Sequence, residues 1–471
     1  MRVGAYAELE ESSPRLSGEA QGLCAPAPAT LTQHLNATES HRTSRASLLA
    51  SGEFFDSVQE VLVVASCSRS GSSVFAELLS RSSRFLQFPG EINHMLRLAG
   101  LAWPISGPSD VLGPEHCTEE AVSALQDHFA LEVGYAAASL ESDEVEEQFD
   151  RSLCRRLSLQ WPLEEFSLEK VSDVRAAAVA DVERRTGRPC DWTTDLQLFH
   201  ALFLKRIRED KPKVNPYYYD LSRQLLAEVF PNLEPAVGPP SPLVIEEPPF
   251  ILVRPWVRWQ PADFSQRALL IKTPSNAYRV GFLRALFPSA RFRLLHLTRN
   301  PAASINGMYD GWYHWGFHSH YVGSELEIPG YSHAERPDRG WWKFDLPPGW
   351  QEYLRSPLEE ICAFQWRAAQ DAILEFAHDA GVDYKRIRFE EILNAVDGRQ
   401  DFLPDLCDWL EIPGDELKAA LAKGLSPVMA TQAPRKRRWR DRANILMRVL
   451  NQPAIRNLSE TLGYSDESEW I

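Results

Sequence analysis

The residues best suited to chemistry are gathered in one short loop, Ser66–Ser73, which reads SCSRSGSS. Gly71 lets the backbone curve closely around an anion, and the serines that follow it supply hydroxyl donors. Arg69 adds a permanent charge whose planar fork suits phosphate or sulfate. The loop is therefore predicted to bind an oxyanion. It is not the GxxxxGK[ST] loop of nucleotide triphosphatases, because no lysine follows Gly71.

A second group with chemical potential follows the apolar run 85–88, where a Pro-Gly break precedes Glu91 and His94. A carboxylate or imidazole beside apolar surface is suited to act as a general base. The alternative is that Glu91 begins a helix and that His94 lies on the surface of this helix. The residues alone leave both interpretations open.

The residues around the first loop predict the elements that position it. Val61–Ala65 is a continuous aliphatic run, typical of a strand buried on both faces. The apolar spacing from Val74 to Leu79 predicts a helix directly after the loop. The loop would then lie at a helix N-terminus, where free N–H groups and the positive end of the helix dipole favour an anion.

Two later segments repeat this order of strand, polar turn and helix. Ala268–Ile271 predicts a buried strand that ends at Lys272, and Phe292–Leu297 predicts another that ends at Arg299. Residues 386–393 predict one more short strand entering a helix. Alternating strands and helices indicate an α/β fold with a central parallel sheet, P-loop-like and three-layered (αβα). Anion-binding groups would gather at the edge where the strands end.

The remaining organisation follows from composition. Residues 1–55 are rich in Ser, Thr, Ala and Pro and are predicted to form a partly disordered extension. Residues 56–471 would form the α/β domain, with a helical insertion or lid over 117–232 that makes one wall of a substrate site.

Charge and length exclude several classes of protein. The formal net charge of -15 argues against a general nucleic-acid binder. No apolar run is long enough to span a bilayer, and the N-terminal residues lack the pattern of a secretion signal, so a cytoplasmic location is expected. The 7 cysteines are scattered without CxxC spacing, which indicates neither a disulfide framework nor a zinc site. The oligomeric state is not indicated.

Two further stretches are rich in groups that bind ligands. The first holds His314, His318 and His320 among aromatic residues. A metal site is not expected there, because no cysteine or acidic residue nearby completes a ligand set, and packing or substrate contact is preferred. The second is the basic run 434–442, predicted to be a flap that closes over phosphate and is anchored by Trp439.

Three motifs together carry a family resemblance. The loop SCSRSGSS after a strand, the segment IKTPSNAYRVGFLRALFPSARF and the segment LLHLTRNP occur in this order. The arrangement resembles the sulfotransferases that use 3'-phosphoadenosine 5'-phosphosulfate (PAPS) as donor, and it covers the chain from about residue 60 to residue 442. The resemblance implies transfer of a sulfuryl group to a hydroxyl of a small-molecule or glycoside acceptor, with PAPS as co-substrate and no metal.

The resemblance also implies a set of donor-binding residues. The family's 5'-phosphosulfate loop matches Arg69, Ser70, Gly71, Ser72 and Ser73. The 3'-phosphate would be bound by Arg299. The family pairs this arginine with a serine eight positions later, where this chain has Gly307, and Ser304 is the nearby substitute. The late basic segment that closes over the donor matches Arg435, Arg438 and Trp439.

For the reaction itself, the resemblance implies that Lys272 approaches the sulfuryl group. Cytosolic members take their base from a histidine after this strand, where this chain has Pro274. Several bacterial and tyrosylprotein members use a glutamate after the first helix, which Glu91 matches, with His94 in reserve. Three alternatives remain: a nucleotide-dependent kinase or phosphohydrolase, a non-catalytic protein that binds an anion or a partner, and an enzyme that takes sulfate from an aryl ester.

Overall fold

The computed structural model describes residues 54–471, apart from 141, 242, 324–325, 333–339, 379–380, 397, 399–400, 426–427 and 471. The extension predicted over residues 1–55 therefore lies almost wholly outside the described residues. Its last two residues, Phe54 and Phe55, belong to helix α2 (Phe54–Ser57) and are buried. Both rings make edge contacts with Phe129, so the folded core begins at this point.

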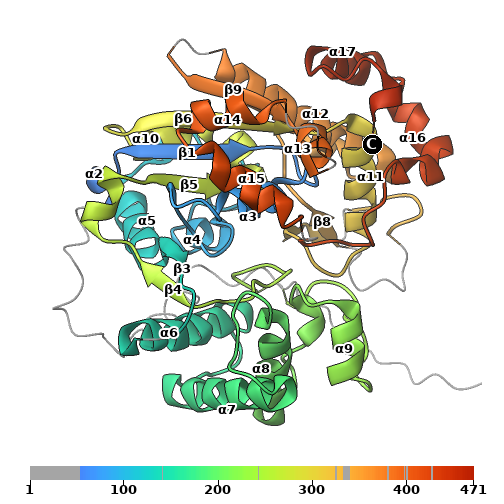
Figure 1. Ribbon diagram of the computed structural model, residues 1–471. Helices are drawn as coiled ribbons and strands as arrows, with labels where there is room; N and C mark the ends of the chain where they lie inside the picture. Colours follow the sequence, from blue (N-terminus) through green and yellow to red (C-terminus); the bar gives the residue numbers. More distant parts are fainter. Residues whose placement is uncertain are drawn as a thin grey trace, which may run out of the picture. The chain divides into compact units, whose positions relative to one another are not determined.

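A seven-stranded sheet organises the described part of the chain (Figure 1). Its order is β4-β3-β2-β5-β1-β6-β9, in which the last five strands are parallel and β3 and β4 pair antiparallel at one edge. The strands are β1 (Glu60–Ala65), β2 (Phe85–Gln87), β3 (Gly134–Ala136), β4 (Trp256–Arg258), β5 (Ala268–Lys272), β6 (Arg291–Thr298) and β9 (Asp383–Arg388). This confirms the predicted α/β class with a mostly parallel sheet.

Strand β1 shows why the sheet has helices on both faces. Its side chains alternate, so Val61 and Val63 enter one hydrophobic cluster while Leu62 and Val64 enter another. Each such side chain stabilises the fold by roughly 1.5–3 kcal/mol when fully buried. The first cluster includes residues of α4 (Asn93–Leu98), α5 (Glu119–Glu132), α10 (Val280–Leu286), α11 (Pro301–Trp312), α12 (Leu358–Ala377), α16 (Ala443–Leu450) and α17 (Pro453–Thr461). The second includes α3 (Ser72–Leu79), α13 (Phe389–Val396), α14 (Leu403–Leu410) and α15 (Gly414–Ala422). The three predicted layers are thus present.

The register of the parallel strands brings the polar turns together. Val64 of β1 is paired with Lys272 of β5 on one side and with Leu295 of β6 on the other. The chain therefore leaves β1, β5 and β6 at the same edge of the sheet. The loop after β1, the end of β5 and the turn at Arg299 become neighbours, as the sequence predicted.

A separate hydrophobic cluster contains the helices α6 (Asp143–Gln160), α7 (Leu168–Thr186), α8 (Leu196–Asp210) and α9 (Arg223–Val229), coloured green in Figure 1. Helix α5 lies within the range 117–232 but packs in the core of the sheet, through Leu125 and Phe129. A small hairpin of β7 (Ser319–Tyr321) and β8 (Trp341–Lys343) stands apart from the main sheet. The division into domains stays a prediction.

The described helices include none that is both long enough and apolar enough to cross a membrane.

Candidate active site

The loop after β1 is shaped by backbone conformations that favour glycine. Gly71 has φ 88° and precedes the first residue of α3. A Cβ at Gly71 would lie 2.5 Å from the ring of Phe389, so this ring packs directly against the bare backbone. The first N–H groups of a helix have no partner within the helix. Ser72 and Ser73, which begin α3, therefore present free amides where an anion is expected.

Three guanidinium groups meet beside this loop, and we call Arg69, Arg299 and Arg438 the arginine cluster. Arg69 donates a hydrogen bond from Nη1 to the Met429 carbonyl at 2.9 Å and lies 4.6 Å from the Phe317 ring centroid. Arg299 donates from Nη1 to the Arg69 carbonyl at 3.2 Å. The Nε atoms of Arg69 and Arg299 are buried without a hydrogen-bond partner among the described residues. Buried donors of this kind are normally satisfied, so the cluster has capacity for a ligand.

The pKa values in the arginine cluster reflect confinement of like charges. Burial, followed by the charges of Arg299 and Arg438, lowers the pKa of Arg69 to about 10. Burial also lowers the pKa of Arg299, opposed by Glu390 and assisted by Arg438. Arg69 therefore remains cationic at neutral pH among these guanidinium groups. An anion placed among them would relieve both the repulsion and the loss of solvent.

The C-terminal basic segment is held over the site by helix α11. Asp310 of α11 accepts from Arg438 at 2.7 Å and from Arg442 at 2.9 Å. Trp439, which is 5% exposed, packs its ring 5.9 Å from that of Trp470. The segment is therefore docked by two ion pairs and an aromatic contact, and Trp439 lies where an anchor was predicted.

Lys272 and Glu91 meet directly. Lys272 Nζ donates to Glu91 Oε1 at 2.7 Å and to Ser73 Oγ at 3.0 Å. Their contact is possible because β5 ends at Lys272 while Glu91 lies between β2 and α4, and β2 and β5 are neighbours. The side chain of Lys272 is 10% exposed and that of Glu91 is 26% exposed. A cation and a carboxylate thus stand at the start of α3.

A cavity of about 440 Å³ is lined by the arginine cluster, by Ser73 and by Glu91, whereas Lys272 is not among its lining residues. Its volume lies in the usual range for sites that bind small molecules. Its apolar walls include Phe317, Phe344, Phe389, Pro249 and Ile251. The predicted site residues that line it are Arg69, Gly71, Ser72, Ser73, Glu91, His94, Arg299, Arg435, Arg438 and Trp439.

Comparison with known proteins agrees with this geometry. Residues 62–336, more than half of the chain, match the profile of the sulfotransferase family. The chain belongs to the sulfotransferase family. Membership in this family indicates a transferase. The matched residues contain the three motifs that carried the resemblance in the sequence. No curated protein matches the chain significantly.

Solved structures show remote likeness. The sulfotransferase domain of the Synechococcus PCC 7002 olefin synthase has 14% identity, covering 86% of this chain and 95% of that one, with a TM-score of 0.33. The sulfotransferase domain from the curacin biosynthetic pathway has 12% identity, covers 86% and 98%, and has a TM-score of 0.34. Sulfotransferase STF9 from Mycobacterium avium has 14% identity, covers 91% and 81%, and has a TM-score of 0.35.

Three of the predicted residues have other surroundings. Ser70 is buried, and its Oγ lies 2.7 Å from Cys67 Sγ. Ser304 is fully buried beside Cys67, while its neighbours Ala303 and Gly307 line the cavity. Neither serine side chain is among those that line the cavity. Both side chains instead contact the buried Cys67 of the loop.

His94 is the third, because it reaches the cavity wall but is engaged elsewhere. Its Nε2 lies 2.9 Å from Glu132 Oε1 and 3.1 Å from Arg156 Nη1, and its side chain is 2% exposed. Burial acts to raise the pKa of Glu132, but Arg156 and His94 hold it well below its usual range. His94 thus belongs to a buried ionic network. Glu91 is the more accessible of the two candidate bases.

Gly307 occupies the position where the family resemblance implies a serine. A Cβ there would lie 3.0 Å from the Cβ of Arg69, which is closer than most side-chain contacts. The side chain of Arg69 therefore fills the space that a larger residue at 307 would need. The glycine at position 307, where the family pattern implies a serine, and the conformation of Arg69 are both explained by this close approach.

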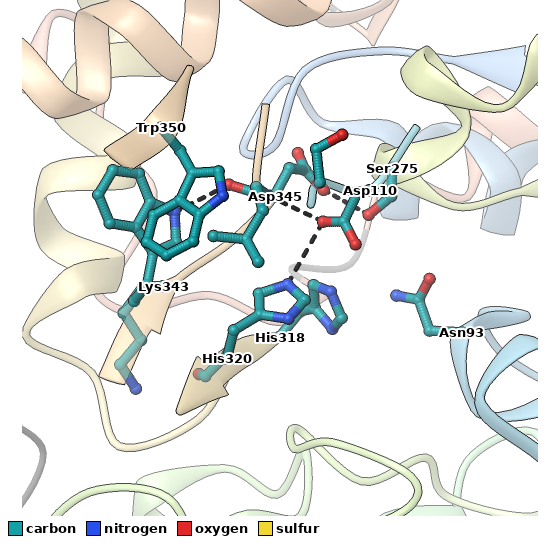
Figure 2. Close-up of polar contacts among 12 residues, drawn as sticks. Asn93, Asp110, Ser275, His318, His320, Lys343, Asp345 and Trp350 are labelled. Atoms are coloured by element: carbon teal, nitrogen blue, oxygen red, sulfur yellow. Dashed lines mark hydrogen bonds and ion pairs between the residues drawn. The ribbon is translucent and has the colours of Figure 1, made fainter. Parts of the chain in front are cut away.

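Sequence analysis missed Asp110 and Asp345, which lie with His318 and His320 near the cavity; the four residues are here called the carboxylate–histidine cluster (Figure 2). Asp345 and His318 line the cavity. Asp345 accepts hydrogen bonds from Ser275 Oγ and, at 3.4 Å, from Ser68 Oγ. Burial, and after it the charge of Asp110, raises the pKa of Asp345. No local sequence signal links these residues, because they come from separate segments.

Proposed function

We propose that this chain transfers a sulfuryl group from PAPS to a hydroxyl of a small-molecule or glycoside acceptor. The observation that carries the proposal is the arginine cluster, in which three half-buried guanidinium groups line one cavity and two of them have buried Nε donors without a hydrogen bond. PAPS bears a 3'-phosphate and a 5'-phosphosulfate, so its charges match separate guanidinium groups.

Each part of the donor has a candidate partner. The resemblance to PAPS-dependent enzymes assigns the 3'-phosphate to Arg299 and the 5'-phosphosulfate to the loop from Arg69 to Ser73. The described cavity supports this division, because residues of both segments line it. Arg435, Arg438 and Trp439 of the docked basic segment would cover the donor.

The reaction is an in-line displacement at sulfur. The acceptor oxygen forms a new S–O bond while the bond between sulfur and the 5'-phosphate oxygen breaks, and the electron pair leaves with the phosphate. Glu91 takes the proton of the acceptor hydroxyl. Arg69, Lys272 and the first amides of α3 stabilise the charge that grows on the leaving phosphate. The products are a sulfate ester and 3',5'-adenosine bisphosphate.

The decisive experiment is calorimetric titration with 3',5'-adenosine bisphosphate, with ATP and 5'-AMP as comparison ligands. We expect micromolar binding that requires the 3'-phosphate. Arg299→Ala is expected to weaken it roughly 10- to 100-fold, the usual effect of losing a charge-assisted hydrogen bond. Arg151→Ala, at a solvent-accessible position of α6 and paired only with Glu147 in the described contacts, serves as the control and should bind normally.

Other outcomes would redirect the assignment. Equal binding of 5'-AMP and the bisphosphate would remove the 3'-phosphate site and favour an aryl sulfate donor. Magnesium-dependent turnover of ATP would favour a kinase or phosphohydrolase. Donor binding without transfer to any acceptor in a broad hydroxyl panel would favour a non-catalytic role.

A further inference from the structure

Asp110, His318 and His320 bring three metal-ligating side chains to one point. One ligand atom from each lies within 4.8 Å of the others. His320 Nε2 is 3.3 Å from Asp110 Oδ2. The two histidines flank Ser319 at the start of β7, whereas Asp110 lies in the segment between α4 and α5, far earlier in the chain. Figure 2 shows both rings beside the carboxylate of Asp110.

The imidazole nitrogens of this group approach carboxylates but make no hydrogen bond among the described residues. His320 Nε2 lies near Asp110 and His318 Nδ1 lies near Glu247, yet neither contact has the geometry of a hydrogen bond. His320 is 5% exposed, so solvent does not supply a hydrogen bond either. Buried polar atoms are normally hydrogen-bonded, and ring nitrogens gathered at a carboxylate without a hydrogen bond point to a ligand.

We propose that Asp110, His318 and His320 bind a divalent transition-metal ion, with zinc the best match. Two imidazoles and a carboxylate are ligands that zinc accepts, at bond lengths of about 2.0–2.2 Å. Two ligands of a tetrahedral ion with such bonds lie about 3.3 Å apart, which is the separation of His320 Nε2 and Asp110 Oδ2. Three protein ligands leave one position for water or substrate, as in catalytic rather than structural zinc sites.

The surroundings provide the outer contacts that metal ligands usually have. Asp110 Oδ2 accepts from the Leu346 amide at 2.8 Å, which fixes the carboxylate. His318 Nδ1 lies 3.2 Å from Glu247 Oε1, the place of an outer carboxylate that orients a metal-bound imidazole. These contacts leave Nε2 of His318 as its metal-binding atom.

Charged groups surround the three ligands. Near them stand the carboxylates of Asp110, Asp345 and Glu247 and the guanidiniums of Arg97 and Arg279. Arg279 Nη2 is 3.4 Å from Asp110 Oδ1, so it occupies one oxygen of that carboxylate. The other oxygen, Oδ2, lies beside His320, where an ion would contact it.

The position of the site relates it to the cavity. His318 lines the cavity together with Asp345 and Ser275. An ion held by His318 would face the same space with its open position. No metal site was expected from the sequence, because no acidic residue lies near the histidines along the chain. The fold brings the carboxylate of Asp110 to them.

The test is a metal titration of the full chain without a histidine tag, after removal of bound metal by a chelator. Co²⁺ is followed by its visible absorption and is then displaced by Zn²⁺. We expect one ion per chain. His320→Gln and Asp110→Asn should weaken binding by at least about 100-fold, and Glu247→Gln by about 10- to 100-fold, the range for outer partners.

His314→Gln is the matched control on the same loop, because His314 Nδ1 accepts from the Gly316 amide and its ring stacks on Trp315. It should bind metal like the wild type. Failure of the wild-type chain to bind either ion, or equal binding by His320→Gln and the control, would overturn the proposal. Should His320→Gln not fold, zinc-edge X-ray absorption of the wild type decides, since a spectrum without imidazole scattering refutes the site.

Discussion

The arginine cluster and the carboxylate–histidine cluster contribute to one cavity but differ in charge and in origin. The first is cationic and comes from residues directly after β1 and β6 and from the docked basic segment. The second combines the ionised carboxylate of Asp110 with two imidazoles that burial keeps neutral. Burial lowers the pKa of His318, and it lowers the pKa of His320 to about 4. The cavity therefore pairs a region suited to an anionic donor with a region suited to proton or cation binding.

The difference in origin separates two kinds of positioning. Arg69 and Arg299 follow buried parallel strands, so the sheet fixes their places. Asp110, His318 and Asp345 lie on or beside short loops and the β7–β8 hairpin. Loops vary more freely than the strands that support them. The sheet therefore fixes the places of Arg69 and Arg299, whereas loop and hairpin conformation fixes those of the carboxylate–histidine cluster.

The largest expected effect comes from removing the central member of the arginine cluster. Arg69→Ala should lower turnover with PAPS and a hydroxyl acceptor by about two to three orders of magnitude, because a preorganised cation at the leaving phosphate is lost. Turnover is measured by transfer of labelled sulfate. Arg151→Ala is the control. Near-normal turnover of Arg69→Ala would remove this residue from the mechanism.

The second prediction separates the two candidate bases. Glu91→Gln should also lower turnover by about 10²- to 10³-fold, because the acceptor hydroxyl loses its proton acceptor. His94→Gln should instead lower the melting temperature, because it breaks the contact with Glu132, and should change turnover by less than about tenfold. Turnover and thermal unfolding are measured on both variants. The reverse pattern would make His94 the base.

The arginine side of the site could be predicted from the sequence because its signals are local. An aliphatic strand, a turn with glycine and a helix are written in consecutive residues around Gly71, and the same order recurs around Arg299. Parallel pairing then brings these turns to one edge without further information. The N-cap of α11 follows the same logic, with Asn300 Oδ1 accepting from the Ala303 amide and Pro301 in the first turn.

The other side could not be predicted, because it depends on contacts between distant segments. Nothing in the sequence near His318 indicates that Asp110 lies beside it. Aromatic residues show the same limit, since Trp312 and Trp342 are fully buried in the core and Tyr219 packs in the helical cluster. Aromatic composition indicates where apolar surface exists, but tertiary packing decides which rings reach a cavity.

A third prediction tests the steric account of Gly307. Gly307→Ser should weaken donor binding by about tenfold, because its Cβ crowds Arg69 and overpacking of this kind costs about 1–3 kcal/mol. Gly307→Ala carries the same Cβ without a hydroxyl and should show an equal loss. Calorimetry with 3',5'-adenosine bisphosphate measures both. Tighter binding by the serine variant would mean that the hydroxyl reaches the 3'-phosphate and that Arg69 yields.

The smallest expected effect concerns the carboxylate–histidine cluster and appears in stability. Because burial and Asp110 raise the pKa of Asp345, the folded state binds its proton more tightly than the unfolded state does. The stability that this proton brings is present at low pH and is lost as the pH rises through the raised pKa.

Asp345→Asn removes that dependence and keeps an oxygen that accepts from Ser275. Its melting temperature relative to wild type should therefore increase as the pH rises above about 4, by on the order of 1–2 °C, when both are measured with a chelator present. Asp466→Asn is the control, because hydrogen bonds from Ser468 lower the pKa of Asp466, so its contribution to stability changes only at more acidic pH and its relative melting temperature should stay level over the same range. A parallel response of the two variants would show that Asp345 is ionised as easily in the folded chain as in the unfolded one. The carboxylate–histidine cluster would then not be a proton-binding side of the cavity.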